Sequence, residues 1–212
     1  MKQLLSLFLA IILTLCLCAC QPQEPERGDQ IDSGKAFSLG VTDGIAYESS
    51  FIGLGFQLPE GWNFYSDEQI REINDQTADI AGEEYLKAME NATVFYDVFA
   101  IDSLGNSINI NLEKVNAAQL LLLDLESNYV SAFDMIKASY ENMGCEGCEY
   151  AIDSVSIDGK DFPCLNITAD FSGVSLHQCI ITVKCNGYLA NISITVVGEN
   201  TISQLVDNFY LL

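Results

Sequence analysis

The chain has 212 residues, of which 9 are Lys or Arg and 30 are Asp or Glu, and its formal net charge is −21. Hydrophobic residues make up 49% and charged residues 18%, a balance that excludes an intrinsically disordered protein. Such an acidic surface is repelled by nucleic acid and by anionic lipid head groups, so we expect neither as a partner.

Residues 1–19 have the pattern of an export signal. A single lysine, Lys2, precedes an apolar stretch that is too short to form a stable membrane span, and polar residues follow. The string LCAC at positions 17–20 resembles the lipobox of bacterial lipoproteins. The resemblance implies removal of the signal before Cys20, attachment of a lipid to Cys20, and anchoring on the outer face of the cell membrane. An ordinary secretory signal is the alternative.

Residues 20–35 are expected to form a tether between this lipidated cysteine and the folded domain. The sequence QPQEPERGDQIDSGK, which follows Cys20, contains two prolines and no aromatic residue, so it has nothing with which to build a core. A flexible chain of this length has a root-mean-square reach of roughly 20 Å. We therefore expect one globular domain over residues 36–212.

The domain begins with strand patterns. The runs AFSLGVT and GIAYESS flank Asp43-Gly44, a dipeptide that favours a hairpin turn. The string GLGFQLPEGW at 53–62 predicts a strand that ends at Pro59, because proline has no N–H to donate to a neighbouring strand. Trp62, the one tryptophan of the chain, is expected to anchor the following corner in apolar surroundings, with an exposed binding role as the alternative.

Helix and strand patterns alternate in the middle of the chain. Ser66 and Gln69 form the sequence pattern of a capping box, and GEEYLKAMEN at 82–91 predicts further helical turns. The runs at 93–102 and 106–111 predict two strands of a hairpin. The apolar run AAQLLLL at 117–123 fits a buried helix or a strand equally well.

The second half predicts a long helix followed by a meander. Apolar residues recur at helical steps up to Gly144, which ends the helix: Tyr129, Phe133, Ile136, Tyr140 and Met143. Four strands are expected at about 149–157, 161–170, 176–185 and 188–197. The last residues, with Ile202, Leu205, Val206 and Phe209 at helical spacing, predict a helix that packs on the sheet. The fold class is therefore α+β, with a mainly antiparallel sheet of about six to seven strands flanked by helices.

The pattern also resembles a family. Tyr47, the string GLGFQLPEGW, a capped helix with TADIAG, the string FYD and a final NFYLL are similar to Gram-positive lipoproteins with a PsbP-like domain. The resemblance covers roughly residues 45–212 and implies an α/β/α sandwich. That fold carries binding and accessory proteins, so no catalytic residue is transferred from it.

Cysteines suggest a disulfide rather than a redox site. Five remain after Cys20, and Cys145 and Cys148 are the only close pair, so a disulfide between these two is expected in an exported domain. Redox catalysis through this pair is disfavoured, because it follows a helix C-terminus and stands beside Glu146 and Glu149, and both features raise a thiol pKa.

A metal site would need Cys145, Cys148, Cys164 and Cys179 on one side of the sheet. The apolar pattern of the two strands places Cys164 and Cys179 on opposite faces. We therefore expect neither a metal nor another cofactor, and we expect buried free thiols instead.

Two further sets of residues are candidates for a catalytic role, which is the alternative to a binding function. His177 is the single histidine, and Glu83 and Glu84 are an adjacent acidic pair, but no GxSxG or HExxH motif accompanies them. The expectation is a non-enzymatic, lipid-anchored binding or accessory protein with an envelope protein or ligand as its partner. The alternatives are a cysteine-based metal or redox protein and an envelope hydrolase that uses His177.

Overall fold

The structure is a computed structural model that describes residues 36–74 and 82–212. The expected signal, Cys20 and the tether lie outside the described residues, as does most of the TADIAG string. Those expectations therefore stay predictions from sequence.

Four short strands form the smaller of two sheets. They follow the order β1-β2-β3-β11, and every neighbouring pair is antiparallel. Their bounds are β1 Val41–Asp43, β2 Ala46–Ser49, β3 Leu54–Gln57 and β11 Phe209–Leu211. The hairpin expected at Asp43-Gly44 is confirmed, and Phe56 in β3 lies between Tyr47 and Phe209.

Seven antiparallel strands form the larger sheet, in the order β4-β5-β6-β10-β9-β8-β7. Their bounds are β4 Asn63–Phe64, β5 Val94–Ile101, β6 Ser107–Lys114, β7 Cys145–Ile157, β8 Lys160–Phe171, β9 Val174–Cys185 and β10 Tyr188–Val197. The expected meander is confirmed. Strand β7 begins at Cys145, four residues earlier than expected, because a bulge around Gly147 (φ 61°) keeps this stretch paired with β8.

Five helices are described: α2 Asp67–Ile73, α3 Glu83–Asn91, α4 Ala117–Leu122, α5 Leu125–Asn142 and α6 Ile202–Val206. The capping box of Ser66 and Gln69 and the long helix that ends before Gly144 (φ 86°) are confirmed. Helix α4 resolves the ambiguous leucine run in favour of a helix. Within the described ranges, none of the helices combines the length and apolar character that crossing a membrane requires.

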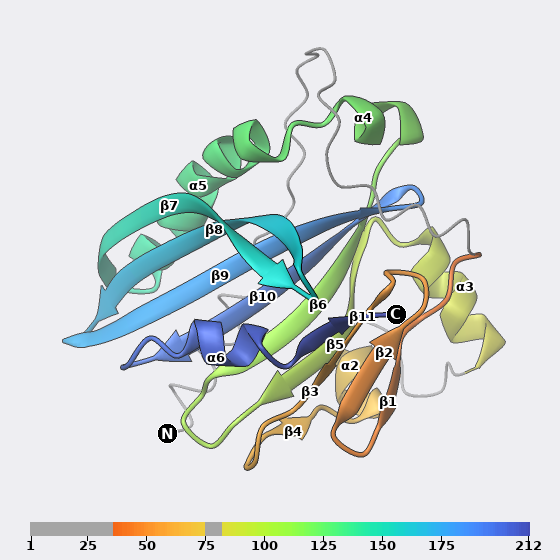
Figure 1. The fold of residues 1–212 in the computed structure, drawn as a ribbon, viewed down its shortest axis with the longest axis horizontal. Helices are drawn as coiled ribbons and strands as arrows, with labels where there is room; N and C mark the ends of the chain where they lie inside the picture. Colours follow the sequence, from red (N-terminus) through yellow and green to blue (C-terminus); the bar gives the residue numbers. More distant parts are fainter. Residues whose placement is uncertain (1–35, 75–81) are drawn as a thin grey trace.

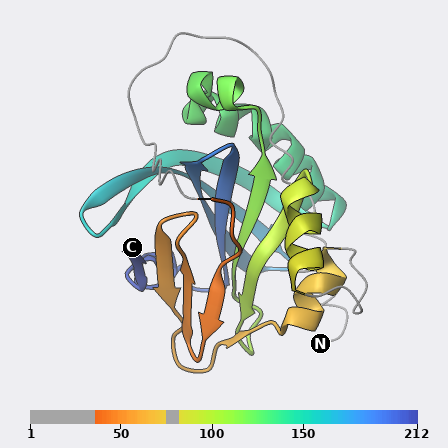
Figure 2. The same ribbon diagram turned by 90° about the vertical axis from the view of Figure 1, so that its right-hand side faces the viewer.

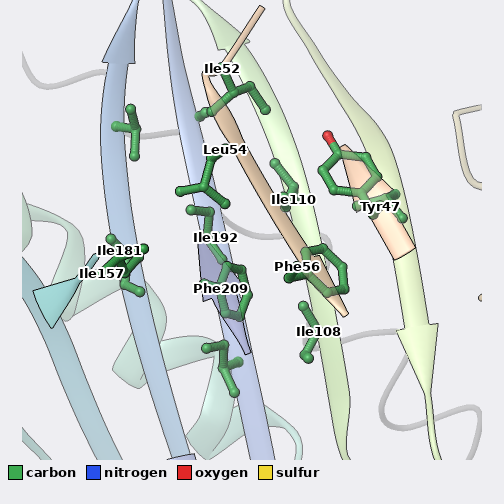
Figure 3. Packing of buried hydrophobic residues seen from close by; sticks show 14 of the residues in the cluster. Tyr47, Ile52, Leu54, Phe56, Ile108, Ile110, Ile157, Ile181, Ile192 and Phe209 are labelled. Atoms are coloured by element: carbon green, nitrogen blue, oxygen red, sulfur yellow. The ribbon is translucent and has the colours of Figure 1, made fainter. Parts of the chain in front are cut away.

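The elements form three layers (Figures 1 and 2). The smaller sheet packs on one face of the larger sheet, while α5 covers β7 and β8 on the other face and α2 lies against β5. The inter-sheet core contains Tyr47, Leu54, Phe56, Ile110 and Ile192, all fully buried (Figure 3). A second core joins α5 to β7, β8 and β9. The layers are thus sheet, sheet and helix, rather than one sheet between helices.

The end of the chain corrects the predicted last helix. Helix α6 stops at Val206, and Phe209 pairs with Phe56 as part of β11. The Oδ2 atom of Asp158 accepts a hydrogen bond from the backbone N–H of Leu211 at 2.7 Å. Phe209 thus contributes its ring to the inter-sheet core from a strand rather than from a helix, stacked on Phe56 with ring centroids 4.9 Å apart.

Candidate functional site

Polar side chains occupy the helix-facing side of the larger sheet at its centre. Alternate residues of β6, such as Ile108 and Ile110, enter the inter-sheet core, and the residues between them face the other way. The same holds for β9 and β10. We call the uncharged polar residues buried at the centre of that side the polar layer: Asn109, Asn111, Gln178, Thr182, Asn191, Ser193 and Thr195. Ser107 and the carboxylate of Glu113 are buried on the same side of β6.

Asn191 connects the three strands of this layer. The register places it directly opposite Asn111 in β6 and Thr182 in β9. Its Nδ2 atom donates a hydrogen bond to Oδ1 of Asn111 at 3.2 Å, and its Oδ1 atom accepts one from Oγ1 of Thr182 at 2.8 Å. The chain of hydrogen bonds therefore runs across three strands.

Two tyrosines tie α5 to the layer. The hydroxyl of Tyr129 accepts a hydrogen bond from the backbone N–H of Thr182 at 3.0 Å, and that of Tyr140 donates to Oε1 of Gln178 at 3.0 Å. Gln178 in turn donates from Nε2 to the hydroxyl of Thr195 at 3.1 Å. Burial raises the pKa of both tyrosines, so both hydroxyls stay neutral.

Two buried polar atoms, one in the layer and one on α5 next to Tyr129 in sequence, have no hydrogen-bond partner among the residues that the structure describes. They are Oγ of Ser193, a residue only 2% exposed, and Nδ2 of Asn128 on α5, 5% exposed. A buried polar atom without a partner costs about 1–3 kcal/mol, so such atoms call for an explanation, and a ligand or a water is a common one. Apart from Glu113 at the end of β6, this side offers neutral amide and hydroxyl groups that donate and accept, which is the chemistry that recognises an uncharged, hydroxyl-rich molecule.

Sequence reasoning missed this layer although a signal was present. The strings SININ at 107–111 and NISIT at 191–195 alternate isoleucine with Ser, Asn or Thr. A solvent-facing strand side in so charged a chain would be expected to carry acidic residues. Uncharged polar residues at every second position instead indicate a polar side that is covered.

A second polar contact joins the two sheets at Asp97. This residue sits at a register shift of β5 between Tyr96 and Val98. Its carboxylate accepts a hydrogen bond from the Tyr47 hydroxyl at 2.5 Å and one from the backbone N–H of Gly40, 3.0 Å from both oxygens. Burial raises the pKa of Asp97 from 3.8 to about 6, although both hydrogen bonds act in the opposite direction.

The prediction that Cys164 and Cys179 lie on opposite faces is wrong. The turn between β8 and β9 has two residues, so Cys179 lies opposite Asn166 and shares a face with Cys164. Apolar residues lie on both faces of β8 and β9 because this part of the sheet is covered on both sides, so their pattern does not show which residues share a face. Both thiols are buried, and the interaction between them lowers the pKa of Cys164 and raises that of Cys179.

Cys145 and Cys148 lie on the other side of the sheet, against α5. The four cysteines considered for a metal are therefore split between the two cores, and no group of three or more potential ligands is assembled within residues 36–74 and 82–212. All five cysteines described are free thiols in the structure. A disulfide between Cys145 and Cys148 remains a prediction for the exported protein.

The residues of the enzymatic alternative lie on the opposite face of the sheet from the polar layer or are exposed. His177 points to the inter-sheet side of β9, opposite Thr168 and Val196, and its Nδ1 atom is buried without a hydrogen bond. Glu83 and Glu84 are exposed in the first turn of α3. The structure does not bring these groups together.

No family model and no curated protein matches the sequence. A crystal structure from Bacteroides thetaiotaomicron VPI-5482 is similar at 12% identity and a TM-score of 0.41 over 81% of this chain, which spans only 49% of that one. LpqN, involved in cell envelope biogenesis of Mycobacterium tuberculosis, is similar at 9% identity and a TM-score of 0.39, covering 74% of this chain and 82% of LpqN. Likeness at this level assigns neither family nor function.

Proposed function

We propose that this chain is a non-enzymatic binding protein, anchored by a lipid on Cys20 to the outer face of the cell membrane, that holds its ligand at the polar layer. The anchor is supported by the export signal and the LCAC string. The resemblance to PsbP-like lipoproteins supports a binding or accessory role, since that fold carries such proteins.

The polar layer is the observation that carries the binding role. The centre of a seven-stranded sheet is the place where a protein of this size normally buries apolar side chains, yet here one side of β6 and β10 carries Asn, Ser and Thr. Burying so many amides and hydroxyls contributes little net stability, because each hydrogen bond replaces one to water. A role in recognition accounts for the layer.

The ligand class follows from the groups available. Amides and hydroxyls pair with hydroxyl groups as both donors and acceptors, whereas the chain's charge of −21 disfavours anions. The ligand is accordingly an uncharged oligosaccharide. Ser193 Oγ in the layer and Asn128 Nδ2 on α5, which make no hydrogen bond within the described residues, are the groups that we expect to bind it.

Calorimetry on the full lipidated chain in detergent tests this function with a panel of uncharged, acidic and basic oligosaccharides. We expect one uncharged class to bind and the Ser193→Ala variant to weaken that binding at least tenfold. Ser203→Ala changes the same residue type at an exposed site on α6 and serves as the control. The proposed site is wrong if nothing in the panel binds, or if both variants bind like the unmodified chain.

A further inference from the structure

Helix α4 presents two leucines to solvent. Leu121 is 60% exposed and Leu122 is 44% exposed, while Leu120 next to them is buried. The helix contains no charged residue, in a chain that has 30 acids. Exposed leucines are ordinary on protein surfaces, so their position in the molecule decides what they mean.

Helix α4 is fixed to the end of the sheet at which β9 turns into β10. The backbone N–H of Val115, just before the helix, donates to the carbonyl of Gly187 in that turn at 2.9 Å. Asn116 caps the helix through its side chain. At the other end, Nζ of Lys184 donates to the carbonyl of Leu123 at 2.5 Å, so the helix is held at both ends.

The chain enters the domain at the same end of the sheet. Phe37 stacks on Tyr188, the first residue of β10, with ring centroids 5.3 Å apart and an interplanar angle of 23°. Tyr188 pairs with Lys114, the last residue of β6 before α4. Figure 2 views this end, with α4 above the point where the described chain starts.

Resting on the lipid anchor of the proposed function, we propose that Leu121 and Leu122 contact the outer leaflet of the membrane. The tether expected from sequence at residues 21–35 would have a reach of roughly 20 Å, which would keep this end of the sheet near the bilayer. Burial of two leucine side chains is too weak to hold a free acidic domain on a membrane, but it suffices once a tether supplies a high local concentration.

The charges around α4 specify the kind of surface. Lys114 and Lys184 border the helix on the sheet side, and Asp124 and Glu126 follow it at the start of α5. Charges of both signs flank α4, and the rest of the protein is acidic. The membrane surface that fits this helix therefore carries zwitterionic rather than anionic head groups. In this orientation the α4 end of the larger sheet faces the membrane. Leu104, 74% exposed in the turn between β5 and β6, lies at the opposite end of the sheet.

Quenching by brominated lipid tests the contact. The lipidated chain carrying Trp62→Phe, which removes the native tryptophan, is reconstituted in phosphatidylcholine vesicles with either Leu121→Trp or Leu104→Trp. We expect brominated phosphatidylcholine to quench Trp fluorescence at 121 at least twofold and to leave the emission at 104 unchanged. Near-ultraviolet circular dichroism establishes that each variant is folded.

The outcomes separate the contact from the anchor. A chain that does not float with the vesicles overturns the lipid anchor. A chain that floats but shows no quenching at 121, or equal quenching at both positions, overturns the leucine contact and leaves the anchor standing. If a tryptophan variant does not fold, hydrogen exchange of α4 in the lipidated wild type decides: vesicles should slow it at least threefold relative to detergent micelles, and an unchanged rate overturns the contact.

Discussion

The hydroxyl of Tyr47 in the smaller sheet donates a 2.5 Å hydrogen bond to the carboxylate of Asp97 in the larger sheet. Both residues belong to the pattern on which the family resemblance rests, although they are 50 positions apart. Gly40 completes the contact with its backbone N–H. The three residues connect the start of the domain, the smaller sheet and the bulge of β5.

Asp97 makes the stability of the domain depend on pH. Its pKa is raised from 3.8 to about 6 by burial, so the folded state binds more protons there than the unfolded state between these values. Its contribution to the free energy of unfolding is therefore fully present below pH 3.8 and is lost as the pH rises through 6, a change of at most about 3 kcal/mol. In urea titrations from pH 4 to 7, Asp97→Asn should remove this fall. The exposed Asp43→Asn should retain it, and equal slopes for all three chains would contradict the assignment.

Gly40 leaves no room for a side chain. A Cβ atom there would lie 2.2 Å from the ring of Tyr47, which is fully buried and held by Asp97. We expect Gly40→Ala to lower the free energy of unfolding by more than about 2 kcal/mol, because the ring must move and give up its hydrogen bond. Chemical denaturation measures this change. Ser38→Ala, two residues away, should shift the midpoint little, and a tolerated Gly40→Ala would show that Tyr47 has space to move.

Neighbouring positions of β10 should respond in opposite directions. Asn191→Ala leaves Asn111 and Thr182 without a buried partner and should cost about 1–3 kcal/mol. Ser193→Ala removes a hydroxyl that has no hydrogen-bond partner within the described residues, and it should leave the stability unchanged or raise it by about 1 kcal/mol. Thermal unfolding of the two variants makes the comparison. A marked loss of stability in Ser193→Ala would mean that the serine supports the fold rather than a ligand.

Cys148 should be the first thiol to react in the folded protein. It is partly exposed, whereas the other four cysteines of the domain are buried. Its pKa is raised, mainly by burial, so alkylation should be slow near pH 7 and accelerate toward pH 9 and above. Mass spectrometry after iodoacetamide treatment of the reduced protein measures this, and Cys148→Ser should abolish the fast phase. Omitting the reduction step tests the predicted disulfide with Cys145, which would block the same phase.

Much of the fold could be predicted because its signals are local. The capping box at Ser66, the apolar stripe ending before Gly144 and the two-residue hairpin turns each specify an element within a few residues. The sequence did not specify which strands share a sheet. The pairing of Phe209 with Phe56 joins positions 153 apart, so a short C-terminal strand was mistaken for the continuation of α6.

The candidate site was harder to predict than the fold. Single polar residues in β6, β9 and β10 become a layer only when register sets Asn191 between Asn111 and Thr182. That Cys164 and Cys179 share a face of the sheet was not predicted for a related reason. A sheet that is covered on both sides carries apolar residues on both faces, so hydrophobicity does not distinguish the faces. In both cases the missing information was which layer covers which face.

Phe37 also determines how the domain bears mechanical load. Its ring packs against Phe51, Phe95 and Tyr188, upstream of β1, the three-residue exposed edge strand. Tension applied to the N-terminal segment acts on these ring contacts before it acts on β1. The contacts therefore protect the pairing of β1 with β2. Tension on the N-terminal segment therefore has to displace the Phe37 ring before it can separate β1 from β2.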